Sequence, residues 1–269
     1  MTPPRPLLGV VHLPALPSAR AHRSMAHVLE RALHDARAYA EGGCDGLVVE
    51  NFGDAPFHKG THDDPVPPDV IAALAVVADR IGAATGLPVA INCLRNDGVA
   101  ALGVAAAIGA RWVRVNVLAG AYVTDQGLIE GEAARLFAYR RRLASDVAVL
   151  ADFLVKHAAP LAPMDVAAAA KDLAERSGAA GLVLSGSRTG EPVDVALLDR
   201  VRTAVGDFPI WLGSGLAVDN AAVLWPRCDG AIVGTACKRG GRVGEPVDVE
   251  RVRALRAACP ATARPGSCG

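Results

Sequence analysis

The sequence has no excess of charge of either sign, because 28 Lys and Arg residues balance 28 Asp and Glu residues. Nucleic acid and anionic membranes attract a surplus of basic groups on one face, so neither is an expected partner. Long hydrophobic runs are also missing, and the longest apolar and glycine run, 99–110, is too short to span a bilayer. No charged segment followed by a long apolar run stands at the N-terminus. We therefore expect a soluble, cytoplasmic protein.

Paired cysteines are absent as well. The six cysteines are scattered and form no Cys-x-x-Cys pair, so neither a zinc site nor a disulfide framework is indicated, and reduced thiols are expected. His58 and His62 lie near Asp63 and Asp64, but this spacing matches no established metal motif. The sequence identifies no cofactor and no metal ligand, and it leaves a divalent metal open without supporting one.

Hydrophobic residues make up 51% of the chain, and many form short β-branched runs between Ala- and Leu-rich stretches. The expected strands are 7–13, 46–50, 89–92, 112–116, 147–152, 181–185, 210–213 and 231–234. The expected helices lie near 25–41, 69–84, 98–109, 131–144, 163–177, 193–205, 218–224 and 249–258. This alternation, with strands too apolar for a one-sided sheet, predicts the α/β fold of a (β/α)8 TIM barrel with eight parallel strands. We expect a single domain over 1–259 and a disordered tail over 260–269.

Polar side chains gather where the expected strands end, and in a parallel barrel these ends open on one face. Glu50 and Asp152 end two non-adjacent strands, so unequal burial could make one a base and the other an acid. Asp54 is a further catalytic candidate, and Arg114 could neutralise negative charge that develops on a substrate. The expected substrate-binding residues are His12, Asn51, Asn92, Arg95, Asn96, Asn116, Ser185 and Thr189.

Lys156 and His157 follow the strand that ends at Asp152, and both are catalytic candidates. A lysine at a barrel mouth can form an imine, or it can hold an anionic group and donate a proton. Because Lys156 stands four residues beyond Asp152, we place it in the loop and favour the second role. His157 could carry a proton, since its usual pKa is near neutrality, or it could be a hydrogen-bonded loop residue.

Glycines follow the last two expected strands. Gly213, Ser214 and Gly215 follow the seventh, and Gly234 and Thr235 follow the eighth. Glycine lets backbone amides approach an anion closely, and TIM barrels frequently bind phosphate at these two loops. Either pair alone could be a tight turn. Together they predict a phosphate site, and hence a phosphorylated small-molecule substrate.

Seven blocks of sequence carry a resemblance to a known family, namely 9–13, 49–57, 94–97, 114–117, 120–127, 152–157 and 213–215. They resemble the BtpA/SgcQ family from the first expected strand to Asp248. The resemblance implies a TIM barrel related to the ribulose-phosphate-binding barrels. It implies little about the reaction. One branch of that family is linked to accumulation of the photosystem I reaction centre in cyanobacteria, and another is encoded with sugar-phosphate uptake and metabolism. The sequence departs from the residues expected for this family at 92–93 and 185–190, and neither departure removes a charged group.

The leading hypothesis is an enzyme that acts on a phosphorylated sugar or a nucleotide-like small molecule. It would transfer protons, as isomerases and epimerases do, or perform a lyase or aldol step that begins with the same proton abstraction. One alternative is a non-catalytic assembly or regulatory factor of the photosystem-biogenesis type. Another is a metal-assisted hydrolase that uses Glu50 and Asp152. The sequence leaves open the substrate, the stereochemistry and whether the chain forms a homo-oligomer.

Overall fold

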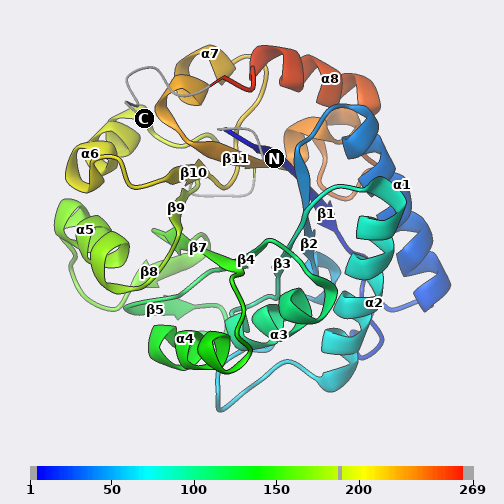
Figure 1. The fold of residues 1–269 in the computed structure, drawn as a ribbon, viewed down its shortest axis with the longest axis horizontal. Coiled ribbons are helices and arrows are strands. Elements are labelled where there is room, and N and C mark those ends of the chain that lie inside the picture. The colour runs from blue at the N-terminus through cyan, green and yellow to red at the C-terminus, as the bar shows by residue number, and fades with distance from the viewer. Residues whose placement is uncertain (1–4, 187–189, 263–269) are drawn as a thin grey trace.

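The computed structural model describes residues 5–186 and 190–262. Eight parallel strands close a barrel in the order β1, β11, β10, β9, β7, β4, β3, β2, and helices surround it (Figure 1). The strands are β1 Leu7–His12, β2 Gly46–Glu50, β3 Val89–Asn92, β4 Trp112–Val115, β7 Ala148–Phe153, β9 Gly181–Leu184, β10 Ile210–Leu212 and β11 Gly230–Val233. The predicted (β/α)8 barrel is confirmed, and each strand boundary lies within one residue of the expected position.

The helices lie outside the barrel. They are α1 Met25–Glu41, α2 Pro68–Thr85, α3 Gly98–Ile108, α4 Ala133–Arg142, α5 Val166–Arg176, α6 Val195–Val205, α7 Ala221–Leu224 and α8 Val249–Ala258. Short 3-10 turns are η1 Phe52–Asp54, η2 Trp225–Arg227, η3 Thr235–Cys237 and η4 Arg239–Gly241. None of the helices within 5–186 and 190–262 has both the length and the continuous hydrophobicity of a transmembrane segment.

Apolar side chains fill the lower part of the barrel. The cluster comprises Leu8, Val10, Val48, Ala90, Trp112, Leu150, Val183, Trp211 and Ile232. The rings of Trp112 and Trp211 meet edge to face with centroids 6.3 Å apart, a favourable geometry for aromatic pairs. A separate, larger cluster lies between the barrel and the helices. The barrel is therefore a packed core and any ligand must approach from an end.

The row of residues above this core is polar. Strand register places His12 beside Glu50, Glu50 beside Asn92, and Asn92 beside Arg114. Side chains two positions apart on a strand share a face. Each of these four residues follows a member of the inner cluster by two positions, so all four face the barrel interior near its C-terminal end.

A small antiparallel sheet lies beside the barrel, where the sequence predicts only loops. It contains β5 Ala121–Thr124, β6 Gly127–Glu130 and β8 Ala158–Pro160, in the order β6, β5, β8. In the turn between β5 and β6, Thr124 Oγ1 donates to the Gly127 carbonyl at 2.8 Å and accepts from the Gln126 amide at 3.1 Å. The sheet connects the segment after β4 to the segment after β7.

The two ends of the described chain meet at the N-terminal ends of the strands. Arg5 Nε donates to the Thr262 carbonyl at 2.6 Å, and Arg5 Nη1 donates to the Trp225 carbonyl at 2.8 Å. The Trp225 indole donates to the Pro260 carbonyl at 3.0 Å. Of the tail expected over 260–269, Pro260 and Thr262 therefore form hydrogen bonds with Trp225 and Arg5, and 263–269 lie outside the described residues.

Candidate active site

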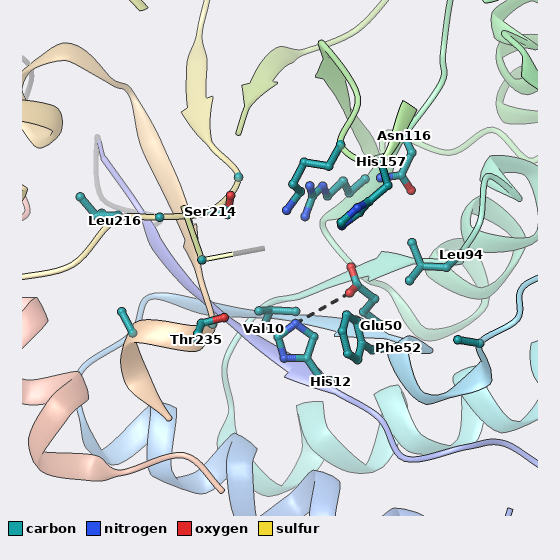
Figure 2. Close-up of a pocket in the computed structure, with 18 of the residues that line it drawn as sticks. Val10, His12, Glu50, Phe52, Leu94, Asn116, His157, Ser214, Leu216 and Thr235 are labelled. Carbon is teal, nitrogen blue, oxygen red and sulfur yellow. Dashed lines mark ion pairs between the residues drawn. The ribbon is translucent and has the colours of Figure 1, made fainter. Parts of the chain in front are cut away.

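A pocket of about 540 Å³ opens at the C-terminal ends of the barrel strands (Figure 2). This volume lies within the range of about 300–1,000 Å³ that is typical for small-molecule sites. The predicted site residues that line it are His12, Glu50, Arg95, Arg114, Asn116, Lys156, His157, Gly213, Ser214, Gly215, Gly234 and Thr235. Most of the residues selected from the sequence therefore share one cavity.

A buried ion pair lies at the base of the pocket. Arg114 Nε donates to Asp152 Oδ1 at 2.8 Å, and Arg114 Nη2 donates to Oδ2 at 3.0 Å. Asn116 Nδ2 also donates to Asp152 Oδ2 at 2.8 Å, and Asn92 Nδ2 donates to Asn116 Oδ1 at 3.2 Å. This two-pronged geometry offsets the cost of burying both charges. Asp152 accepts three hydrogen bonds and holds Arg114 and Asn116 in place, and it does not itself line the pocket.

Glu50 is the carboxylate that faces the pocket. Its Oε1 lies 3.8 Å from His12 Nε2, as the dashed line in Figure 2 marks. Burial raises the pKa of Glu50, although the charges of Arg114 and Lys156 oppose the rise. Burial and the charge of Lys238 lower the pKa of His12 to about 3, so its imidazole is neutral. Glu50 thus combines contact with the pocket and a pKa moved towards neutrality, as a general base requires.

Lys156 reaches the pocket from the loop that follows β7. Burial, together with the charge of Arg114, lowers its pKa to about 8. Arg95 Nη2 donates to the backbone carbonyl of Lys156 at 2.5 Å, which ties this loop to the end of β3. His157 lines the same wall with an exposed side chain and a backbone φ of +54°. An amine that titrates near physiological pH can serve as an acid or, when neutral, as a nucleophile.

The loops after β10 and β11 line the opposite part of the pocket with backbone. Among the described residues, the amides of Ser214, Gly215, Thr235 and Ala236 have no hydrogen-bond acceptor. The buried Ser214 hydroxyl likewise has no partner in the part of the chain that the structure describes. Gly215 has a φ of +75°, and a Cβ there would lie 2.0 Å from the Glu191 carbonyl oxygen, so the turn requires glycine. Backbone amides that lack an acceptor among the described residues and belong to residues lining one cavity form a site suited to an anion.

Three predicted residues lie behind the pocket and support its loops. Asn51 Nδ2 donates to Asp54 Oδ2 at 3.0 Å, and Asp54 Oδ1 accepts from the Leu16 amide at 2.7 Å. Asn96 Oδ1 accepts from the Val117 amide at 2.6 Å. Buried backbone donors need such acceptors. The geometry therefore gives Asn51, Asp54 and Asn96 positions in loop structure, and none of the three lines the pocket.

The remaining predicted residues also lie away from the pocket wall or outside the described residues. Asn92 belongs to the network around Asp152. The Ser185 hydroxyl is buried without a partner among the described residues, and a Cβ on Gly213 would lie 2.5 Å from it. Thr189 lies outside the described residues. Glycine at 213 therefore leaves space for the Ser185 side chain to pack beside the loop that follows β10.

Sequence reasoning missed the apolar wall of the pocket. Phe52, Phe57 and Leu94 line it, and Asp125 reaches it from the turn between β5 and β6. The rings of Phe52 and His12 have centroids 4.7 Å apart. Aromatic residues are only 4% of the chain. Two phenylalanines in one loop after a polar strand end were therefore a usable signal.

The histidines of the loop after β2 do not form a metal centre. His58 Nδ1 lies 2.9 Å from Asp64 Oδ1, and Asp64 Oδ2 accepts from the Lys59 amide at 2.9 Å. These contacts order the loop itself. Within 5–186 and 190–262, no group of three or more His, Cys, Asp or Glu side chains could hold a metal ion.

Solved structures match this barrel at low sequence identity. Phosphoribosyl anthranilate isomerase from Thermus thermophilus gives a TM-score of 0.56 at 16% identity, covering 94% of this chain and 97% of that one. Orotidine 5'-phosphate decarboxylase from Pyrococcus horikoshii gives 0.56 at 14% identity, covering 94% and 99%. At these identities the likeness concerns the TIM-barrel fold alone.

Sequence relatives are much more similar. The photosystem I biogenesis protein BtpA of Synechocystis sp. is 46% identical over 251 residues, which cover 93% of this chain and 86% of that protein. An uncharacterized protein of Pyrococcus furiosus is 42% identical and covers 93% of both chains. An uncharacterized mitochondrial protein of Caenorhabditis elegans is 31% identical, with 92% and 91% covered. A sequence model of the BtpA family matches residues 4–260. The chain belongs to the BtpA family.

Proposed function

We propose that this protein is an enzyme that moves a proton on a small phosphorylated substrate. One observation carries the proposal: a single pocket joins anion-binding donors that have no partner among the described residues with an acid and a base group that form no ion pair with each other. The donors are the amides of the loops after β10 and β11 and the Ser214 hydroxyl. The acid and base groups are Glu50 and Lys156, which contact the same cavity. A site that only maintained the fold would pair these groups with one another.

Glu50 is the proposed base, and it would take a proton from a carbon next to a carbonyl group of the substrate. Lys156 as the ammonium ion would then give a proton to the carbonyl oxygen, so that an enediol forms. Arg114 would stabilise the negative charge on that oxygen in the transition state, because Asp152 holds the guanidinium in advance. Glu50 would then return the proton to the former carbonyl carbon while the now neutral Lys156 takes the hydroxyl proton from the neighbouring carbon, which completes an isomerisation and restores both groups. Departure of a leaving group, with its electron pair, from the carbon next to the enediol would instead give a lyase.

The anion site is tested without knowledge of the substrate. Inorganic phosphate should raise the melting temperature, because a ligand present at a hundred times its Kd stabilises the folded state by about 2.7 kcal/mol. Ser214→Ala should weaken phosphate binding by about 1–3 kcal/mol through loss of a hydrogen bond to a charged group. It should leave the free protein as stable as before, since the hydroxyl has no hydrogen-bond partner within 5–186 and 190–262.

Thermal melts and calorimetric titration measure both effects. Ser18→Ala is the control, because Ser18 is exposed and does not line the pocket. Absence of any phosphate effect in the wild type, or equal affinity in Ser214→Ala and Ser18→Ala, would remove the basis of the proposal.

A second chemistry is favoured by the lowered pKa of Lys156. With a pKa of about 8, a substantial share of this amine is neutral near pH 7.5, and a neutral amine can attack a carbonyl to form an imine. Borohydride reduction in the presence of a carbonyl-bearing sugar phosphate would then add a stable mass to Lys156. If the protein mass did not change, the imine would be excluded and Lys156 would keep the role of proton donor.

A non-catalytic assembly role is the second candidate function. Its support is the 46% identity to a photosystem I biogenesis protein. A factor that only scaffolds a partner has no need of a phosphate site, so its melting temperature should not respond to phosphate. The metal-assisted hydrolase gains no support, because the described residues offer no metal-binding group.

A further inference from the structure

The pocket has two chemically different ends. The anion-binding loops follow β10 and β11, whereas Leu94 and Arg95 follow β3. In the closed barrel β3 is the fourth neighbour of β10 in both directions, so these segments stand across the mouth from each other. Figure 2 shows Ser214 and Thr235 on one side, Leu94 and Phe52 on the other, and the Glu50 carboxylate between.

The end far from the anion loops is apolar and partly aromatic. Phe52 and Phe57 are half-buried and Leu94 is buried, and all three line the cavity. The ring of Phe52 rests at a tilt of 58° against the ring of His12, which fixes its orientation. The Arg95 amide donates to the His58 carbonyl at 3.1 Å, which holds the segment after Phe57 against the end of β3. This wall is therefore built into the fold.

Polar groups edge the same wall. Arg95 and Asp125 line the pocket there. Their opposite charges attract each other electrostatically. A simple sugar phosphate would bring hydroxyl groups against the phenylalanines, where they would lose hydrogen bonds with water. A planar heterocycle instead offers flat faces for aromatic contact and polar edges for a guanidinium and a carboxylate.

We propose that this end of the pocket is a subsite for a heteroaromatic ring, so that the substrate is a phosphate ester carrying a heterocycle, as a nucleotide does. This inference rests on the proposed function, because it takes the anion loops as the phosphate end. The proton-transfer chemistry does not use the apolar wall, so the wall is a separate observation that restricts the class of substrate.

Titration calorimetry with three probes tests the subsite. The probes are inorganic phosphate, ribose 5-phosphate and uridine 5'-monophosphate, which share an anion and differ in the ring. The nucleotide should bind at least about fivefold tighter than ribose 5-phosphate, as loss of base stacking typically costs about 1 kcal/mol or more. Phe57→Leu and Phe52→Leu should each remove much of this difference and leave ribose 5-phosphate affinity unchanged.

The outcomes separate this inference from the proposed function. Equal binding of ribose 5-phosphate and the nucleotide would overturn the ring subsite and retain the phosphate site. Leucine variants that weaken both ligands alike would overturn it as well. Failure of all three probes to bind would overturn both proposals. Phe57→Leu keeps the test valid if Phe52→Leu disturbs His12 and folding, and a melting curve of each variant shows which case applies.

Discussion

Glu50 and Asp152 both end barrel strands, yet their surroundings differ. Asp152 accepts three hydrogen bonds from Arg114 and Asn116. Glu50 has a neutral histidine at 3.8 Å and an open cavity. Burial raises the pKa of Glu50, so its ionised form is less favourable in the folded protein than in the unfolded chain. The two carboxylates should therefore have opposite effects on stability.

Glu50→Gln should increase the free energy of unfolding near pH 7, because the neutral amide avoids burying a charge. The raised pKa makes this gain largest above the folded-state pKa of Glu50, and it should vanish well below pH 4.5, where the wild-type carboxyl is protonated in both states. Urea unfolding at several pH values measures it, with the exposed Glu130→Gln as control. A loss of stability at pH 7 would show that Glu50 is a structural partner.

Asp152→Asn should lower the free energy of unfolding by about 3–5 kcal/mol, since it leaves the buried Arg114 without its counter-charge. The same urea series measures this change. A stable Asp152→Asn variant would contradict the positioning role assigned to Asp152.

Lys156 should titrate close to pH 8. The chain has four lysines, Lys59, Lys156, Lys171 and Lys238, so NMR of ¹³C-methylated lysines can resolve them. A signal that titrates near 8 should disappear in Lys156→Arg and persist in Lys171→Arg, whose site is exposed. If the ammonium ion is the catalytic acid, activity should fall as pH rises through 8, and an imine-forming amine would show the reverse. Titration of Lys156 near 10.5 would contradict this account.

At this scale the sequence predicts which residues meet but not what each one does. Glu50 and Asp54 stand in one polar block, and nothing in it reveals that Asp54 bonds the distant Leu16 amide. The same holds for Asp152, whose pairing with Arg114 depends on strand order around the barrel. Residue type and position at a strand end are readable from sequence, whereas hydrogen-bond partners require the closed structure.

A buried ion pair ties the segment after η3 to α1. Lys238 Nζ lies 2.5 Å from Asp35 Oδ2, and Asp35 Oδ1 accepts from the Val247 amide at 2.9 Å. Both side chains are almost fully buried. Because Lys238 directly follows η3, which begins at Thr235, the pair fixes one anion-binding loop to a helix on the outside of the barrel.

Asp35→Ala should lower the free energy of unfolding by about 3–5 kcal/mol, because it leaves the buried Lys238 ammonium and the Val247 amide without an acceptor. Glu41→Ala should cost at most about 1 kcal/mol, because its pair with Arg253 is exposed. Adding Lys238→Met to Asp35→Ala should recover part of the loss. Denaturant unfolding of the four proteins measures these terms. Similar losses for Asp35→Ala and Glu41→Ala would contradict the importance of the buried pair.

Elements with a clear period are predictable from this sequence, and short ones are not. Helices α1 and α8 begin and end where the pattern places them, since their apolar faces repeat over several turns. The strands β5, β6 and β8 contain only three or four residues each. So short an alternation cannot be distinguished from a loop, and the pairing of β5 with β8 joins segments far apart in the chain.

On the scale of the whole barrel, the thiols of the described residues are buried. Cys44, Cys93, Cys228, Cys237 and Cys259 are buried and unpaired, and burial raises the pKa of each. Thiolates are the reactive form, so these five should resist maleimide in the native protein. With Cys268→Ser, labelling should be slow until urea unfolds the barrel and should then reach five thiols together. Rapid labelling under native conditions would show that part of the barrel opens independently.

The hydrogen bonds from Arg5 to Thr262 have a practical consequence for handling the protein. They bring both ends of the described chain to the side of the barrel where the strands begin, and the pocket opens where the strands finish. A surface tether or a fused reporter attached at either end would point away from the mouth and leave it accessible. A short peptide bridge between these ends, with new termini in an exposed loop, would give a circular permutant with an undisturbed pocket.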